Sequence, residues 1–315
     1  MKHLRLIAFL WLPAMSFGVP AGVAVMIQDP QARGDYIDRP APPASAEAKK
    51  EMEARLEEAR RRYEANPNDA QAIIWLGRRL AYPGRFREAI DTYSEGIRKF
   101  PRDARFYRHR GHRYITLRRF DLAIADLTKA ASLIKGKPDQ VEPDGQPNVR
   151  NIPTSTLQFN IWYHLGLAYY LTGQNKQALD AYRQCLKVSK NPDAFAATTH
   201  WLYMTLRRLN RAAEAGKVLE PVREGMDIIE NAGYYRLLLM YKGIVPAESL
   251  LEETLKQESS AGSHSILYGL GNWHLYNGRR EEALKIYERM LGSDQWTSFG
   301  YIAAEADVKR MSDKL

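Results

Sequence analysis

Small and bulky apolar residues recur at fixed spacings along the chain, and this pattern predicts pairs of helices. Gly77 and Gly111 stand 34 residues apart, and the same interval separates Ala89 from Ala123. Four windows share one order of residues: a bulky residue, a glycine four positions later, an alanine twelve positions after the glycine, and a bulky residue four positions after the alanine. Their glycines are Gly77, Gly111, Gly166 and Gly271, and their alanines are Ala89, Ala123, Ala178 and Ala283. A fixed period of this length indicates a repeat architecture.

The residue types explain why each window predicts two helices that cross. Helices approach closely only where the side chains between them are small, so glycine and alanine mark the crossing and bulky residues fill the space beside it. Pro83-Gly84, Thr172-Gly173 and Asn277-Gly278 are typical of the end of a helix and the turn after it. Two weaker windows follow the same order, one centred on Tyr203 and one over about 228–262.

This order of residues resembles the signature of the tetratricopeptide repeat (TPR), W-x2-L-G-x2-Y followed by A-x3-F. The resemblance covers residues 67–293 as about five to six repeats. It implies an all-α fold, a solenoid in which antiparallel helix pairs wind into a right-handed superhelix. Capping helices are expected at both ends, over residues 47–66 and 294–315; the first of these is rich in Glu, Lys, Arg, Ala and Leu.

One long insertion interrupts the repeats. Gly111 and Gly166 are 55 residues apart, so 21 residues exceed the period of 34, and they correspond to residues 135–155. Four prolines in this insert predict a surface loop rather than a helix. Its acidic residues, Asp139, Glu142 and Asp144, match no calcium-loop spacing, and we expect them to be solvated.

The start of the chain is typical of an exported protein. Lys2 and Arg5 precede an uncharged run from Leu6 to Ile27, which predicts a signal peptide over residues 1–27 or an uncleaved N-terminal membrane anchor. Residues 28–46 contain four prolines and several small residues, which favours an extended linker. The expected location is therefore the periplasm or cell envelope, and the expected contact with a membrane is only through residues 6–27.

The resemblance also implies which side chains face a ligand, because the first helix of each TPR lines the concave wall of the superhelix. Counting from the small residue of each first helix gives a wall that is basic near its start and aromatic in its middle. The candidate peptide-binding residues are Arg78, Arg105, Arg108, His112, Tyr163, Tyr170, His200, Arg207, Arg208, Tyr268, Asn272 and Tyr276. Arginines can pair with carboxylates, and tyrosines offer flat contact area to a peptide or to sugar rings.

Composition narrows the classes of function. The net charge is +9, but the basic residues are spread along helices rather than gathered into one tract, so no nucleic-acid partner is predicted. The single cysteine, Cys185, occupies a small-residue position of a repeat and is expected in the core. The chain lacks the common phosphate-binding, metalloprotease and serine-hydrolase motifs, and we therefore predict no enzyme activity, no catalytic residue, no metal site and no cofactor.

Together these features predict a non-enzymatic scaffold or adaptor that binds a protein or peptide in the periplasm or cell envelope. An alternative is a repeat protein that binds an envelope polysaccharide through the tyrosines of the wall. An active site within residues 135–155 and nucleic-acid binding are the two remaining alternatives.

Overall fold

The computed structural model describes residues 36–313, and in this part of the chain helices are the only extended elements. The predicted signal or anchor over residues 1–27 lies outside the described residues, as does residues 28–35 of the predicted linker. One short 3-10 helix, η2 (Tyr36–Asp38), comes first. Fourteen α-helices follow: α2 (Ala46–Ala65), α3 (Ala70–Ala81), α4 (Phe86–Lys99), α5 (Ala104–Thr116), α6 (Phe120–Ile134), α7 (Leu157–Leu171), α8 (Asn175–Val188), α9 (Pro192–Arg208), α10 (Ala212–Leu219), α11 (Ala232–Tyr241), α12 (Ala247–Leu255), α13 (Ala261–Tyr276), α14 (Arg280–Leu291) and α15 (Phe299–Ser312).

The helices from α3 to α14 form consecutive antiparallel pairs, and local sequence explains where the first helix of several pairs begins. The side chain of Asp69 accepts hydrogen bonds from the backbone N–H groups of Gln71 and Ala72 at the start of α3. Asp103, Thr156 and Asn191 cap α5, α7 and α9 in the same manner, and α13 begins with a capping box. Such caps satisfy backbone donors that have no partner inside the helix.

The glycine of each strong window lies where the two helices of a pair cross. Gly77, Gly111, Gly166 and Gly271 face Tyr93, Leu127, Tyr182 and Tyr287 of the second helix. The alanines of the same windows, such as Ala89 and Ala123, are fully buried. The weaker windows also form pairs, α9 with α10 and α11 with α12. The all-α solenoid predicted from the sequence is confirmed.

We expect Gly166→Ala to destabilise the fold by about 1–2 kcal/mol. A Cβ at this position would lie 2.7 Å from Cε1 of Tyr182, which is fully buried and cannot move without repacking. Overpacking costs about 1–3 kcal/mol, and the better helix propensity of alanine offsets about 1 kcal/mol. The matched control is Gly216→Ala in α10, where a Cβ meets nothing within 4 Å. Urea denaturation should show opposite signs for the two variants, and equal effects would contradict the crossing argument.

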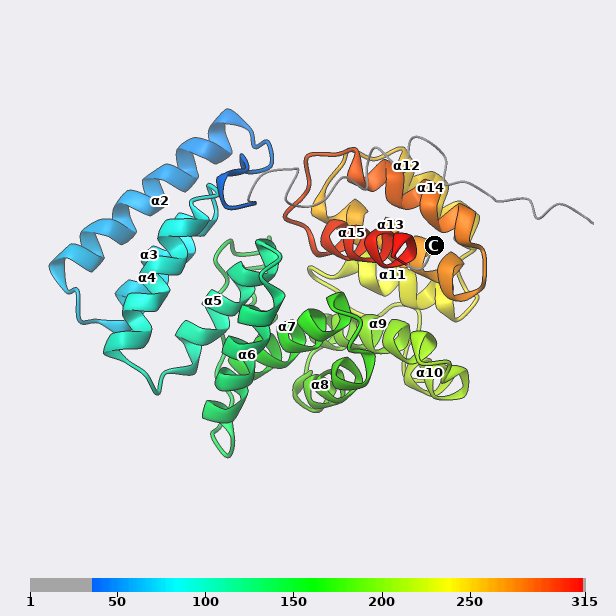
Figure 1. Cartoon of the computed structure of the whole chain (residues 1–315), viewed down its shortest axis with the longest axis horizontal. Coiled ribbons are helices and arrows are strands. Elements are labelled where there is room, and N and C mark those ends of the chain that lie inside the picture. Colours follow the sequence, from blue (N-terminus) through cyan, green and yellow to red (C-terminus); the bar gives the residue numbers. More distant parts are fainter. Residues whose placement is uncertain (1–35, 314–315) are drawn as a thin grey trace, which may run out of the picture.

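The array bends until its last helix lies against its middle. Figure 1 shows the helices following one another around a bend that has α2 near one end and α15 near the other. α15 packs on α13 and α14 and also contacts α7, which lies far from it in the sequence. Its buried face contains Tyr301, Ile302, Ala303, Ala304 and Val308. The helix predicted as a cap therefore also covers part of the inner side of the array.

A cluster that we call the clasp joins the start of the described chain to its end; it consists of Tyr36, Pro40, Arg118, Trp296 and Glu305. Nε1 of Trp296 donates to the carbonyl oxygen of Pro40 at 2.8 Å, and the rings of Tyr36 and Trp296 lie 5.6 Å apart. Arg118 donates to Glu305 at 2.7 Å and to the carbonyl oxygen of Trp296 at 2.9 Å. Tyr36 donates to the same glutamate. The clasp closes the bend.

Candidate functional site

The twelve candidate residues of the concave wall fall into two groups in the structure. The residues of α7, α9 and α13 come together in the C-terminal half, and those of α3 and α5 line the N-terminal half. In the C-terminal half, Tyr163, Tyr170, His200, Tyr268 and Asn272 are buried. The expectation of an open aromatic wall is therefore wrong for these five residues. The tight bend and α15 cover them.

The aromatic side chains of this half pack on one another. His200 stacks on Tyr234 with ring centroids 4.7 Å apart, and Trp201 stacks on Tyr268 at 5.8 Å. The hydroxyl of Tyr163 donates to that of Tyr234 at 3.2 Å. Burial lowers the pKa of His200 to about 3, so its imidazole is neutral at physiological pH. These side chains form core rather than a face for a ligand.

Arg207 and Tyr276 are the members of this group at its edge, and both are half-buried. The guanidinium of Arg207 lies 4.2 Å from the ring centroid of Tyr276 and donates to the hydroxyl of Tyr203 at 3.1 Å. The pair is thus accessible in part, while already engaged in contacts within the chain. Its predicted contact with a ligand stays a prediction.

Arg208 binds a carboxylate of the last helix. Nη1 of Arg208 donates to Asp307 of α15 at 2.7 Å, and its Nε donates to Asn272 at 2.8 Å. The hydroxyl of Tyr268 donates to the same carboxylate at 3.0 Å, and Arg310 pairs with it as well. Burial alone would raise the pKa of Asp307, but the two guanidinium groups outweigh it and lower the pKa to about 2. Asp307, which sequence analysis missed, is the hub of this cluster.

The N-terminal half carries the arginines of α3 and α5. Arg108 is buried, and its Nη2 lies 2.8 Å from Oε1 of Glu142 in the insert. Burial lowers the pKa of Arg108, Glu142 opposes this shift and the neighbouring Arg78 adds to it. His112 packs between His164, at 4.4 Å, and Phe299 of α15, at 5.3 Å. Glu142 is itself buried, so the expected solvated acidic patch is corrected at this residue.

We call residues 135–156 the strap, because they cross from the first repeats to the loop between α10 and α11. Near its start, Glu142 accepts no solvent exposure beyond 9% and its backbone N–H donates to Ser155 at 3.1 Å. Further along, the carbonyl oxygen of Gly145 accepts from Nη1 of Arg79 at 2.7 Å. At the far end, Arg150 pairs with Asp227 at 2.7 Å. The strap thus lies over concave positions of α3 and α5.

Comparison with known families now adds to the geometry. Tetratricopeptide-repeat families match residues 76–139, 159–192 and 266–299. The chain is a tetratricopeptide-repeat protein. The three matched segments contain the pairs α3–α6, α7–α8 and α13–α14 in whole or in large part.

Solved structures similar to this TPR protein are TPR proteins of low sequence identity. The crystal structure of YrrB, described as a TPR protein with an unusual peptide-binding site, is 16% identical with a TM-score of 0.43, and the match covers 82% of this chain and 100% of that chain. A crystal structure of MamA is 16% identical with a TM-score of 0.43, over 63% of this chain and 95% of that chain. No curated protein matches the chain.

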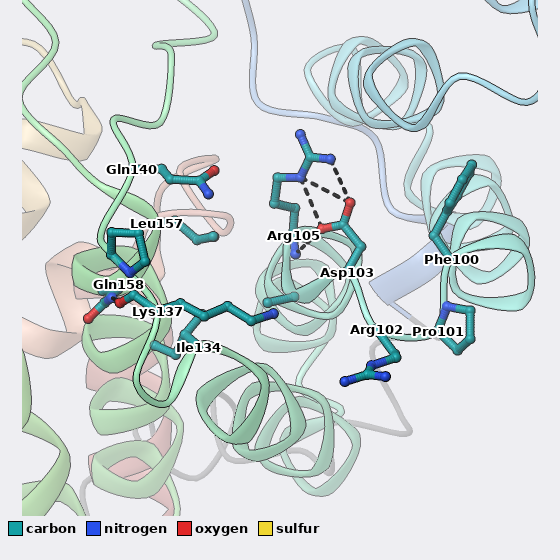
Figure 2. A pocket seen from close by; sticks show the side chains of 12 residues that line it. Phe100, Pro101, Arg102, Asp103, Arg105, Ile134, Lys137, Gln140, Leu157 and Gln158 are labelled. Atoms are coloured by element: carbon teal, nitrogen blue, oxygen red, sulfur yellow. Dashed lines mark hydrogen bonds and ion pairs between the residues drawn. The ribbon is translucent and has the colours of Figure 1, made fainter.

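A surface pocket opens beside the base of the strap in the TPR protein. Figure 2 shows it between the turn before α5 and the segments on either side of the strap, with a cavity volume of about 560 Å³. Its cationic side chains are Arg102, Arg105 and Lys137. Arg105 is held by Asp103, to which its Nε and Nη2 donate at 2.9 and 2.6 Å, and these hydrogen bonds raise the pKa of Arg105. Arg105 therefore lies at the edge of the predicted wall, beside this pocket.

Two searches of residues 36–313 bear on other classes of function. Within this range, no three side chains of His, Cys, Asp or Glu gather as metal ligands would, and none of the helices is long and apolar enough to cross a membrane. Cys185 is buried, and burial raises its pKa to about 12, while its Sγ lies 3.1 Å from Oγ1 of Thr198. A thiol with this pKa stays protonated and does not act as a nucleophile.

Proposed function

We infer that this TPR protein is a non-enzymatic scaffold that binds protein or peptide partners through the basic side chains of its concave face. The observation that carries the inference is that this face already binds polypeptide. Arg108 pairs with Glu142 of the strap, and Arg208 pairs with Asp307 of α15. Two arginines at equivalent kinds of position thus hold carboxylates of segments that are not part of the wall. Arginine suits this task because its planar group can make paired hydrogen bonds to a carboxylate.

The proposed location is the periplasm or cell envelope. Its support is the basic start, Lys2 and Arg5, followed by an uncharged run from Leu6 to Ile27. Detection of the full-length chain in the cytosolic fraction of cells would argue against this location.

No observation favours the alternative of a polysaccharide ligand. That reading depended on tyrosines exposed along the wall, and Tyr163, Tyr170 and Tyr268 are buried. Stacking on a sugar ring requires an open aromatic face.

The test is affinity capture from an envelope extract with the full chain and an Arg78→Ala/Arg105→Ala variant. Both side chains are half-buried and lie at the open edges of the N-terminal wall. We expect the variant to retain at least about tenfold less of a captured protein, which corresponds to about 1.4 kcal/mol of binding free energy. The matched control, Arg61→Ala/Arg98→Ala, removes the same charge from exposed positions of α2 and α4. Equal capture by all three proteins would overturn the proposed role of the wall.

A further inference from the structure

The strap is bound to the wall without being packed into the core. Among residues 36–313, the large hydrophobic side chains that are exposed include Val141, Val149 and Ile152 of the strap, with exposed fractions of 62%, 100% and 45%. Apolar side chains that face solvent contribute nothing to holding a segment in place. What holds residues 141–152 are polar contacts, at Arg108, at Arg79 and at Asp227.

The surface beneath the strap carries more positive charge than the strap neutralises. Arg78, Arg108 and Arg113 are close enough to lower one another's pKa values or to act on a shared neighbour. Glu142 makes the ion pair with Arg108, and even this pair is incomplete. Nε of Arg108 and Oε2 of Glu142 are both buried without a hydrogen-bond partner. A buried donor and acceptor left unpaired weaken the attachment.

The strap shows what kind of segment fits this surface. The residues that face it are Glu142, Pro143, Asp144 and Gly145, an extended run with two carboxylates one residue apart. Glu142 binds Arg108, and Arg78 acts electrostatically on Asp144. The carbonyl oxygen of Gly145 binds Arg79, and a Cβ built on this glycine would collide with Oη of Tyr82. The surface therefore selects a Glu-x-Asp order followed by a residue without a side chain.

We propose that residues 142–145 are an internal occupant of a binding site for extended acidic peptides, and that a partner segment of this chemistry displaces the strap from α3 and α5. The proposal rests on the proposed function and names its ligand class. α15, by contrast, is fixed by a buried apolar face and by the Asp307 cluster, and it stays in place. The tethered strap competes at a high effective concentration, so the intact protein binds such a peptide weakly and a released strap exposes the site.

The experiment measures the binding of a fluorescent peptide by anisotropy. The probe has the sequence of residues 138–149 of this chain, PDQVEPDGQPNV. The full chain is compared with a Glu142→Gln/Asp144→Asn variant. We expect the variant to bind the probe at least about tenfold more tightly than the unaltered chain. A control peptide with Gln and Asn in place of Glu and Asp in the EPD motif should not bind either protein.

A second variant guards against a folding defect caused by the unpaired Arg108. Arg150→Ala removes an exposed ion pair at the far end of the strap and leaves both carboxylates intact. It should tighten binding of the probe by several fold. Unchanged affinity in both variants, or equal binding of the acidic and the amide peptide, overturns the proposal.

This test is separate from that of the proposed function. Tight binding of the probe together with equal capture of envelope proteins by the wall variants would leave the strap proposal standing and remove the scaffold role. Capture that depends on Arg78 and Arg105, together with no effect of the strap variants, would do the reverse.

Discussion

Asp307→Ala is expected to lower the free energy of unfolding by about 3–5 kcal/mol. The carboxylate is 2% exposed and neutralises Arg208, whose side chain is 12% exposed. Without it, a buried guanidinium keeps its charge and loses its counterion, which costs far more than the ion pair itself contributes. The hydroxyls of Tyr268 and Tyr287 also lose their acceptor. Urea denaturation monitored by circular dichroism measures the change.

The position on α15 provides a close control. Lys309 lies two residues further along the same helix and is exposed, so Lys309→Ala should change stability by no more than about 0.5 kcal/mol. Adding Arg208→Met to Asp307→Ala should recover part of the loss, because the uncompensated charge is then gone. A loss below about 1 kcal/mol for Asp307→Ala, or no recovery in the double variant, would contradict the buried cluster.

Mild acid is expected to destabilise the protein steeply. His109, His164, His200 and His264 are buried, and burial lowers the pKa of each below the usual 6.5, to about 3 for His200 and about 4 for His264. Below pH 6.5 the unfolded chain binds these protons and the folded chain does not. Each such histidine removes about 1.4 kcal/mol per pH unit, so the four together remove about 5 kcal/mol per unit until the folded pKa values are reached.

The carboxylate of Asp307 has the opposite dependence at lower pH. Its folded pKa of about 2 is below the usual 3.8, so its contribution is complete above about pH 4 and is lost as the pH falls toward 2. The histidines therefore dominate between pH 6.5 and 4. Denaturation curves at pH 7, 6 and 5 measure the slope, and His200→Phe should reduce it by about 1.4 kcal/mol per pH unit. Stability that is flat over this range would refute the account.

The helix pairs could be predicted from the sequence because their packing is local. Gly166 and Tyr182, which meet at a crossing, are sixteen residues apart, and any pair with this order packs in the same way. The path of the array depends instead on contacts between distant residues. Arg208 and Asp307 are 99 residues apart, and no spacing rule connects them. This is why the concave positions were placed on the correct helices while the burial of Tyr170 and Tyr268 was missed.

Some signals for the missed residues are present in the sequence. Asp307 follows Ala303 and Ala304 and precedes Val308 on the apolar face of the predicted last helix, where an acid has no place unless a base meets it. Glu142 offers no such signal, since an acid among prolines reads as solvated loop. Its burial depends on where the strap crosses the wall, and that path is set by the far-end contacts near Asp227.

The clasp has a consequence for how this family member can change in evolution. Solenoids commonly gain or lose repeats by duplication or deletion, because each repeat contacts only its neighbours. Here Trp296 must reach Pro40, 256 residues away, at the other end of the bend. Each helix adds a width of roughly 8–10 Å to the array, so one pair more or less would carry Trp296 out of reach. The number of repeats is therefore constrained as the number of blades in a closed propeller is, and duplications that an open array tolerates would here break the closure.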